Sequence, residues 1–245
     1  LRRRGMGRLA EILGPDALEL DLIARTVGLN RIAAAEWKTL PDETRRLTQA
    51  FADGINQFIN DSRGNLPIEF DLLGYQPEPW APVSSLEIEG ELRWYLTVRL
   101  PVICIPEIAK RTLGDGVLYR AFLTGEADEE SILPAGSYPA RRSGSTLVGA
   151  AIGDPSEGQG SNNWVIAGKN TTTGKPLLAS DPHIAFAAVS CWYEAHLSGG
   201  SFNVTGMTYA GLPAFMFGRN EKLAWGITNN ICSVRDIYQE KPDPR

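Results

Sequence analysis

A serine that could act as a nucleophile lies at position 161, in the stretch GQGSNNW at residues 158–164. It lacks the G-x-S-x-G elbow that presents the nucleophile of α/β-hydrolases. Ser161 is therefore open to two interpretations. It is either a turn residue at the entry to a strand, or a nucleophile whose hydroxyl attacks the carbonyl of the preceding Gly160.

The nucleophile interpretation needs few other catalytic residues. Attack on Gly160 would shift the upstream chain from nitrogen to oxygen, and hydrolysis of that ester would leave Ser161 with a free α-amine. Such an amine, with an ordinary pKa of about 7.7 to 8.0, can serve as the base for the hydroxyl of the same residue. The glycine before the serine leaves room for the strained attack. A separate His–Asp pair is then not required.

The chain has two histidines, His183 and His196. His196 lies in the alternating run WYEAHL at residues 192–197, which predicts a strand and favours a structural or surface histidine. His183 follows Asp181 and Pro182 at the end of a short predicted strand. From such a loop position its ring can point at the start of a neighbouring strand. A functional and a structural role both stay open for His183.

The residues upstream of these groups predict helices. Apolar side chains recur at spacings of three and four from residue 8 to residue 61, and one helical segment opens at Pro41. That segment predicts a single core-facing stripe formed by Leu47, Phe51, Ile55, Phe58 and Ile59. A further helical region is predicted over residues 84–124. We expect it to be broken near Pro101 and Pro106, because proline has no N–H to donate.

Residues 125–160 differ in character from the sequence on either side. They are rich in glycine, proline and acidic residues, and they cannot bury enough apolar area to offset the entropy of ordering. We therefore expect a linker. After it the chain returns to strand-forming runs, at residues 164–167, 177–179, 189–197, 202–209, 214–217 and 223–228.

Composition excludes several classes of protein. With 245 residues, 43% hydrophobic and 22% charged, the chain can bury an ordinary core. A formal net charge of −5 without a basic stripe argues against nucleic acid as a partner. The apolar runs stay well below the roughly 20 residues that cross a bilayer, so we expect no membrane span. Cys104, Cys191 and Cys232 are too scattered for a disulfide framework and are interpreted as buried apolar thiols.

Several motifs follow one another in an order that is typical of a known family of hydrolases. They are GSNNWV at 160–165, GK at 168–169, TGKPLLASDPH at 173–183, GLP at 211–213, FGRN at 217–220 and AWGITN at 224–229. Upstream, FDLLGYQPEPW at 70–80 is similar to a motif late in that family's small subunit. Together they resemble the penicillin acylase family of N-terminal-nucleophile hydrolases, over most of residues 8–80 and 160–240.

The resemblance implies an α+β fold, the four-layer αββα sandwich, in a precursor that is cut at both ends of a spacer. Residues 1–124 would form a helical small-subunit part, residues 125–160 the spacer, and residues 161–245 the start of the β-rich large subunit. The implied activity is the removal of an acyl group from a small linear amide, as in penicillin, cephalosporin and acyl-homoserine-lactone acylases. A periplasmic or secreted location would be typical of the family.

The catalytic roles that the resemblance implies fall on three residues. Ser161 would be the nucleophile, with its own amine as base, and His183 would orient it. The backbone N–H of Asn229 would form one half of an oxyanion hole. The other half, an asparagine side chain, is implied to lie farther along than Arg245. Since both ends of the chain look cut, we expect this piece alone to have little or no activity.

The specificity for the acyl group is implied less directly. Histidine at position 183 resembles the cephalosporin, echinocandin and acyl-homoserine-lactone acylase branches, whereas phenylacetyl-selective members tend to have glutamine there. The same alignment places three side chains in an apolar acyl pocket, although ordinary core positions would look alike: Ile184, Phe217 and Ile227.

A structural calcium ion is a further implication, and the chemistry itself requires no cofactor. Asp236 matches one ligand of the calcium that some members bind, and Glu107 matches another by a looser alignment. Ser233 stands where those members have a second carboxylate. Calcium takes six to eight oxygen ligands, so these residues suggest the ion without completing its site.

A second hypothesis belongs to another functional class. A diverged relative could keep the fold without the chemistry and act as a binding or assembly module. Mass spectrometry separates the two. A break before Ser161 indicates the enzyme, and an intact chain without acyl transfer indicates the module.

Overall fold

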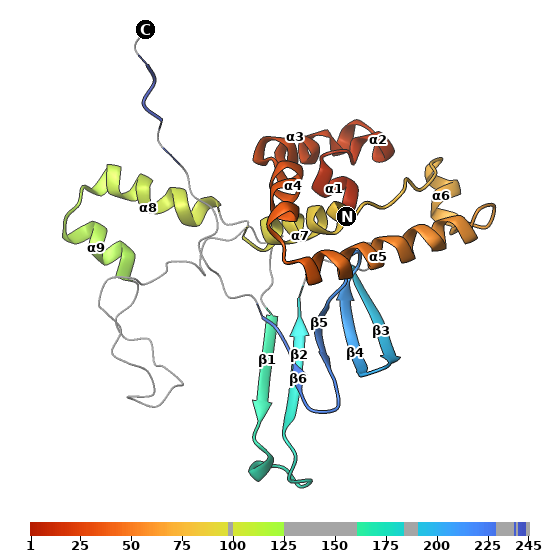
Figure 1. The fold of residues 1–245 in the computed structure, drawn as a ribbon. Coiled ribbons are helices and arrows are strands. Elements are labelled where there is room, and N and C mark those ends of the chain that lie inside the picture. The colour runs from red at the N-terminus through yellow and green to blue at the C-terminus, as the bar shows by residue number, and fades with distance from the viewer. Residues whose placement is uncertain (98–99, 125–160, 184–190, 229–237, 239, 244–245) are drawn as a thin grey trace. The chain divides into compact units, whose positions relative to one another are not determined.

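The computed structural model describes residues 1–97, 100–124, 161–183, 191–228, 238 and 240–243 of the chain, and the side chains of residues 100–103 are not among them (Figure 1). The chain divides into two compact units. One comprises Leu1–Leu96 with Gly160–Asn230, and the other comprises Thr97–Gln159 with Ile231–Arg245. The groups singled out around Ser161 belong to the first unit.

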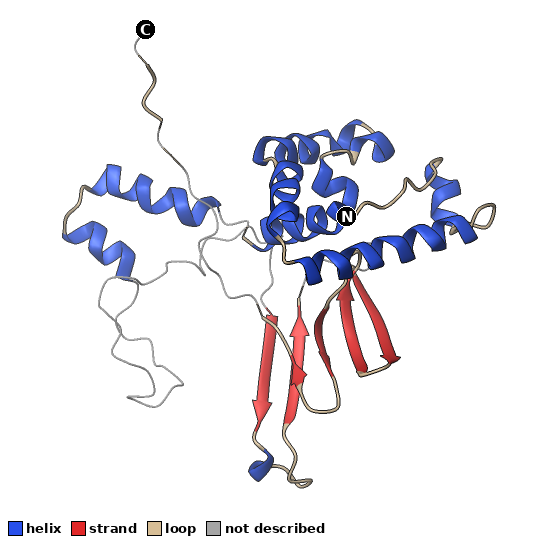
Figure 2. Cartoon of the chain, in the orientation of Figure 1, coloured by secondary structure: helices blue, strands red, loops and turns tan. Residues whose placement is uncertain are grey.

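The α-helices precede the strands along the described chain, and both strand groups are antiparallel, so the fold class is α+β as expected (Figure 2). The helices of the first unit are α1 (Arg2–Met6), α2 (Ala10–Leu13), the 3-10 helix η1 (Pro15–Ala17), α3 (Leu18–Val27), α4 (Leu29–Thr39), α5 (Asp42–Asp61), α6 (Ile68–Leu73), α7 (Pro82–Leu96) and the 3-10 helix η3 (Gly168–Asn170). The second unit contains α8 (Leu100–Leu113) and α9 (Val117–Thr124).

Helix α8 corrects the expected helix break. Pro106 lies inside α8 and does not end it. The break expected near Pro101 is present, because α7 ends at Leu96 and α8 begins at Leu100. A second division lies between α8 and α9, around the left-handed Gly114 at φ 69°. A glycine adopts the left-handed conformation without steric cost, which favours the end of a helix at Gly114. A proline inside a helix removes one hydrogen bond and can bend the helix without ending it.

Helix α5 corrects the predicted core stripe. Its buried residues are Thr48 and Ala52, whereas Leu47 and Phe58 are more than 60% exposed within the described part of the chain. Helix α5 packs on α7. The other three residues of the predicted stripe, Phe51, Ile55 and Ile59, are half-buried. The small side chain of Ala52, which is fully buried, allows close approach of two helices.

Two sheets follow in the first unit. A two-stranded sheet pairs β1 (Ser161–Ile166) with β2 (Leu177–Pro182). A four-stranded sheet has the order β3-β4-β5-β6, and its members are β3 (Trp192–Gly199), β4 (Phe202–Tyr209), β5 (Phe215–Arg219) and the short β6 (Ala224–Trp225). Strand β4 has the bounds of the strand-forming run predicted at residues 202–209.

Helix α7 is the centre of the helical part. It contacts α1, α4 and α5, and its residues Ile88 and Leu92 join Tyr209 and Leu212 in one buried cluster. Gly211 is required at this junction. Its φ of +97° disfavours other residues, and a Cβ there would lie 2.3 Å from Cδ1 of Ile88. The contact therefore ties the turn after β4 to the helix.

Two buried carboxyl groups also lie on α7. Glu87 is 6% exposed, and burial raises its pKa to about 7 against the opposing charges of Arg2 and Arg8. Glu91 is 3% exposed, and burial raises its pKa although Arg4 Nε lies 2.8 Å from its Oε1. Helix α7 thus carries acidic groups in a place where their charged form is disfavoured.

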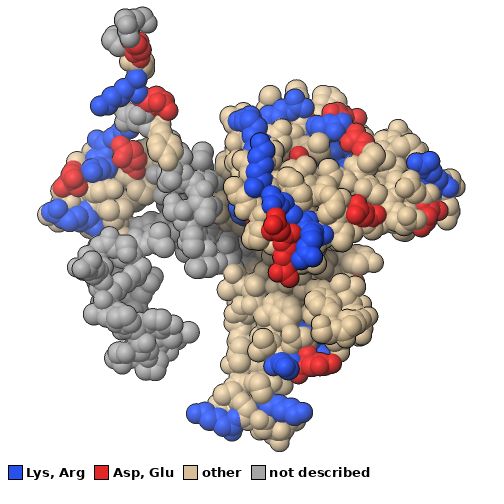
Figure 3. All heavy atoms as spheres, viewed as in Figure 1, with Lys and Arg blue, Asp and Glu red and all other residues tan. Residues whose placement is uncertain are grey.

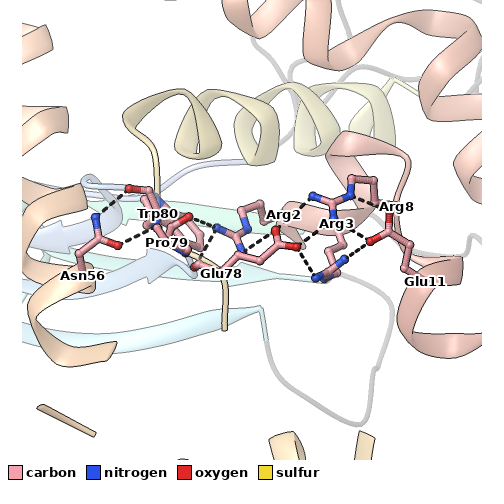
Figure 4. A network of polar contacts seen from close by, with 8 residues as sticks. All are labelled: Arg2, Arg3, Arg8, Glu11, Asn56, Glu78, Pro79 and Trp80. Atoms are coloured by element: carbon pink, nitrogen blue, oxygen red, sulfur yellow. Dashed lines mark hydrogen bonds and ion pairs between the residues drawn. The ribbon is translucent and has the colours of Figure 1, made fainter. Parts of the chain in front are cut away.

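An arginine cluster ties the first helices to the loop before α7 (Figure 4). Arg8 donates to Glu78 at 2.8 and 3.1 Å and to Glu11 at 2.7 Å, and Arg3 donates to the same two carboxylates at 3.0 and 2.7 Å. Arg2 donates to the carbonyl of Pro79 at 3.0 Å. The hydrogen bond from Arg8 is the main cause that lowers the pKa of Glu78, and it lowers that of Glu11 to about 2.

The loop that carries Glu78 is fastened from its other side as well (Figure 4). The Asn56 side chain of α5 accepts from the Trp80 N–H at 2.7 Å and donates to the Trp80 carbonyl at 2.9 Å. These two bonds satisfy the main-chain N–H and C=O of Trp80, which lies outside any helix or strand. The QPEPW motif therefore connects α1 and α5, through these hydrogen bonds, to the segment that leads into α7.

The surface is mixed in charge. Figure 3 shows basic and acidic side chains near one another on the face that it presents. Among the described residues, none of the helices is both long and apolar enough to span a membrane.

Candidate active site

Ser161 lies at the end of a two-stranded ladder. It is the first residue of β1 and pairs with Pro182, the last residue of β2. The strand therefore begins three residues before the apolar run that predicted it. Because Pro182 cannot donate a main-chain hydrogen bond, the ladder ends at this pair and the next residue is available for other contacts.

Two segments distant in sequence contact Ser161. The main-chain N–H of His183 donates to Ser161 Oγ at 3.3 Å, and Thr228 Oγ1 donates to the Ser161 carbonyl at 3.0 Å. Since Oγ is the acceptor in the first bond, its own proton is left for another acceptor. The second bond holds the peptide plane that follows the serine. The geometry thus positions both the hydroxyl and the backbone of Ser161.

The imidazole of His183 has a carboxylate partner. Its Nε2 lies 2.8 Å from Asp181 Oδ2, with Pro182 between the two residues. The His183 ring is 39% exposed and the Asp181 side chain 73% exposed, so the pair lies at the surface of the described residues. What contacts Ser161 is therefore the main chain of His183, while its ring is engaged by Asp181.

The segment after β6 reaches Ser161 because of a glycine. Ser180 Oγ on β2 donates to the Ile227 carbonyl at 3.4 Å. A Cβ at Gly226 would lie 2.7 Å from Cβ of Ser180, so only glycine allows this approach without a shift. The approach brings Thr228 to the serine, and Asn229 is the next residue in the chain.

The other predicted site residues are placed as follows. Ile227 is half-buried on the segment just described. Phe217 lies on β5 and its ring packs edge-on against Trp192 at 4.8 Å between centroids, a contact within the four-stranded sheet. Gly160, Ile184, Asn229 and Asp236 lie outside the described residues.

His196 has a different environment from His183. It is exposed on β3, and its Nε2 lies 2.8 Å from Oδ1 of Asn203. Asn203 in turn donates to Glu221 at 3.0 Å. His196 belongs to a surface network of the four-stranded sheet, as its alternating sequence indicates.

The described residues do not assemble a metal site. They contain no group of three or more His, Cys, Asp or Glu side chains that could hold an ion. Glu107 on α8 is exposed and accepts from Arg111 Nε at 2.9 Å. Cys104 and Cys191 are free thiols and only partly buried.

Sequence reasoning had not singled out two residues at this site. Thr228 is part of the AWGITN motif, but only the fold shows that its hydroxyl meets the Ser161 carbonyl. Asp181 is two residues from His183, a spacing that places both on one face of an extended segment and that could have suggested the pair. Asp181 lies near the end of β2, and Thr228 lies in the segment after β6.

Comparison with known proteins supports the family that the order of the motifs indicated. The family model described as penicillin amidase matches residues 1–245. The chain is 33% identical to penicillin acylase 2 proenzyme of Pseudomonas sp. (strain SE83), 32% identical to the acyl-homoserine lactone acylase QuiP of Pseudomonas aeruginosa, and 23% identical to penicillin G acylase of Escherichia coli. Each alignment covers 98% of this chain but 32%, 30% and 35% of the relative. The chain spans about a third of the length of these relatives.

Proposed function

The chain belongs to the penicillin amidase family, and we propose that it comes from a self-processing amidohydrolase that removes an acyl group from a linear amide. One observation carries the proposal. The serine that opens the first strand is contacted by two segments distant in sequence, at its Oγ by the His183 N–H and at its carbonyl by Thr228. A turn serine needs neither contact.

In the proposed maturation, Ser161 Oγ attacks the carbonyl carbon of Gly160 and loses its proton. The C–N bond between the two residues breaks, the serine nitrogen takes a proton, and the upstream chain is held as an ester on Oγ. Water then cleaves the ester, which yields the carboxyl group of Gly160 and restores the hydroxyl. Ser161 is left as a residue with a free α-amine, at the start of a large subunit.

In the proposed turnover, that α-amine accepts the Oγ proton while Oγ attacks the carbonyl carbon of the substrate amide. The developing oxyanion would be stabilised by the main-chain N–H of Asn229, which follows Thr228 directly. The proton passes to the leaving amine as the C–N bond breaks. Water then hydrolyses the acyl ester by the same route.

The wider proposal includes the αββα sandwich of N-terminal-nucleophile hydrolases, with residues 1–124 in a small subunit, a spacer over residues 125–160 and a large subunit that starts at Ser161. Ile184, Phe217 and Ile227 would line the acyl pocket. Relatives named as penicillin acylase and acyl-homoserine lactone acylase support a small acylated amine as substrate. A structural calcium held with Asp236 stays a prediction.

The decisive test uses Ser161→Ala in the full-length precursor. We expect neither cleavage between Gly160 and Ser161 nor hydrolysis of phenylacetyl, glutaryl or long-chain acyl amides, because the nucleophilic oxygen is gone. Intact mass and N-terminal sequencing report the cleavage. Ser198→Ala, on the exposed end of β3, is the matched control and should mature normally.

A second variant distinguishes self-cleavage from cutting by another protease. Ser161→Cys should retain partial processing, because a thiolate can perform the same acyl shift. A Ser161→Ala precursor that is still cut before position 161 would refute self-cleavage. An intact wild-type chain without acyl transfer would instead support the non-catalytic binding module.

A further inference from the structure

The carbonyl group of Ser161 is the part of the nucleophilic residue that the proposed mechanism leaves unused. In the ladder Ser161 lies opposite Pro182, which has no N–H and cannot donate to this carbonyl. A donor comes instead from Thr228, 67 residues away, whose Oγ1 lies 3.0 Å from the Ser161 carbonyl oxygen. A side chain thus supplies a hydrogen bond that the residue opposite in the strand pair cannot supply.

The segment that leads to Thr228 is itself anchored at two points. Trp225, three residues earlier, donates from Nε1 to the Phe215 carbonyl of β5 at 3.2 Å. The Ile227 carbonyl, on the residue just before Thr228, accepts from Ser180 Oγ of β2 at 3.4 Å. The hydroxyl of Thr228 is therefore presented to Ser161 from a main chain that is tied to both β5 and β2.

The contacts with Ser161 fall on two different branches from its Cα. The His183 N–H donates to Oγ on the side chain, and Thr228 donates to the carbonyl oxygen on the main chain. When both of these branches are held, the direction of the third branch, which ends in the nitrogen, is determined as well. In the proposed maturation this nitrogen loses its bond to Gly160, and a chain end is poorly ordered unless other contacts hold it.

We propose that Thr228 is a positioning residue that, through the Ser161 carbonyl, holds the α-amine and Oγ of Ser161 in the arrangement in which the proton passes between them. This inference rests on the proposed function of Ser161. The α-amine remains the base, and Thr228 neither touches the reacting atoms nor transfers a proton. In the precursor the same bond would hold Ser161 while Oγ attacks Gly160.

A purely stabilising role is disfavoured by the exposure of Thr228. Its side chain is exposed among the described residues, and substitutions at exposed positions usually change stability little. Valine has nearly the same shape as threonine and lacks the hydroxyl. Thr228→Val should therefore keep the fold, so that a loss of activity reports on the position of Ser161.

Thr208 offers a matched control within the same unit. Its Oγ1 donates to the Tyr193 carbonyl at 3.3 Å, between two strands of the four-stranded sheet. The chemistry is the same as at Thr228, a threonine hydroxyl on a main-chain carbonyl, but Ser161 is not involved. Thr208→Val thus removes an equivalent bond away from the candidate site.

The first experiment measures maturation and turnover of the full-length protein. Because misplacement of reacting groups by about 1 Å can cost about 100-fold, Thr228→Val should lower kcat by about 10- to 100-fold with little change in KM. Thr228→Ser, which restores the hydroxyl, should recover most of kcat, and Thr208→Val should keep the wild-type rate. The acyl amide is the one that the wild type hydrolyses fastest among phenylacetyl, glutaryl and long-chain acyl amides.

Two results of this experiment would overturn the positioning role. One is a wild-type kcat in Thr228→Val, and the other is a Thr228→Ser variant as slow as Thr228→Val. If Thr228→Val is not cut at Gly160, intact mass over time decides in the same way. Cleavage of Thr228→Ser near the wild-type rate supports the role, and failure of both variants to mature refutes it.

The second experiment observes the hydrogen bond without relying on activity. Serine labelled with 13C at the carbonyl and asparagine labelled with 15N select the Ser161–Asn162 peptide bond, because Ser-Asn occurs once in residues 1–245. Loss of this signal in Ser161→Ala assigns it in the full-length protein. A hydrogen bond moves a carbonyl 13C resonance to higher frequency, so Thr228→Val should shift it to lower frequency, whereas Thr208→Val should leave it unchanged.

The two experiments separate this inference from the function on which it rests. A wild-type protein that is neither cut at Gly160 nor active would refute the proposed function, and the positioning role with it, even if the carbonyl signal shows the contact. An active wild type whose carbonyl signal and kcat are unchanged in Thr228→Val would refute the positioning role alone.

Discussion

Replacing the buried Glu87 on α7 by glutamine should stabilise the protein increasingly as the pH rises. The carboxyl group is 6% exposed, and burial raises its pKa from an ordinary 4.5 to about 7, against the lowering effect of Arg2 and Arg8. Glutamine has nearly the same shape as the protonated carboxyl group and never becomes charged. The variant should therefore keep the favourable form at every pH.

The sign and size follow from the proton balance. Between the unfolded pKa of 4.5 and the folded pKa of about 7, the folded protein binds more protons, so its stability falls as the pH rises. Each pKa unit corresponds to about 1.36 kcal/mol. From about pH 5 to about pH 8, this one group should lower the stability of the wild type by about 2 kcal/mol, a loss that Glu87→Gln avoids.

The assay is urea unfolding followed by tryptophan fluorescence at several pH values. The free energy of unfolding of Glu87→Gln, relative to wild type, should rise by about 2 kcal/mol across the range. Glu19→Gln, exposed on α3, is the control and should show a constant difference. A difference for Glu87→Gln that stays constant, or that rises toward low pH, would refute the reasoning.

Two further predictions concern a packing contact and the expected ion. Gly211→Ala should lower the free energy of unfolding by more than about 1 kcal/mol, because it adds a Cβ at positive φ against α7, whereas Gly54→Ala, in the open interior of α5, should raise it by about 0.5 to 1 kcal/mol. Denaturant titration of both variants measures this, and equal effects would contradict it. Asp236→Asn should lower the melting temperature only when calcium is present. Identical melting curves with and without chelator, for wild type and variant alike, would remove the calcium prediction.

Local patterns in the sequence determined much of the architecture. The family prediction is confirmed, because the penicillin amidase model matches residues 1–245. Strand β4 follows from its β-branched and aromatic residues, and the helices of the first 61 residues follow from apolar spacing. These features depend on neighbours within a few residues, which is why the sequence shows them. The roles of Ser161, His183 and Asn229 stay predictions.

Contacts between segments that are distant in sequence could not be predicted from local patterns. The fully buried residues of α5, which packs on α7, are Thr48 and Ala52, whereas Leu47 and Phe58 of the predicted stripe are exposed. The pairing of Glu78 with Arg3 and Arg8 joins residues about 70 positions apart, and neither local run predicts it. Spacing along a helix indicates which residues share a face, but only the partner decides which face is buried.

The site around Ser161 shows the same division. Its sequence indicated a hydroxyl directly before a strand-forming run, and the order of motifs identified the family. Only the tertiary structure decided that Thr228, 67 residues away, donates to the Ser161 carbonyl and that the main chain of His183, rather than its ring, reaches Oγ. The physical reason is that a hydrogen bond depends on distances of a few ångströms, which chain separation alone does not determine.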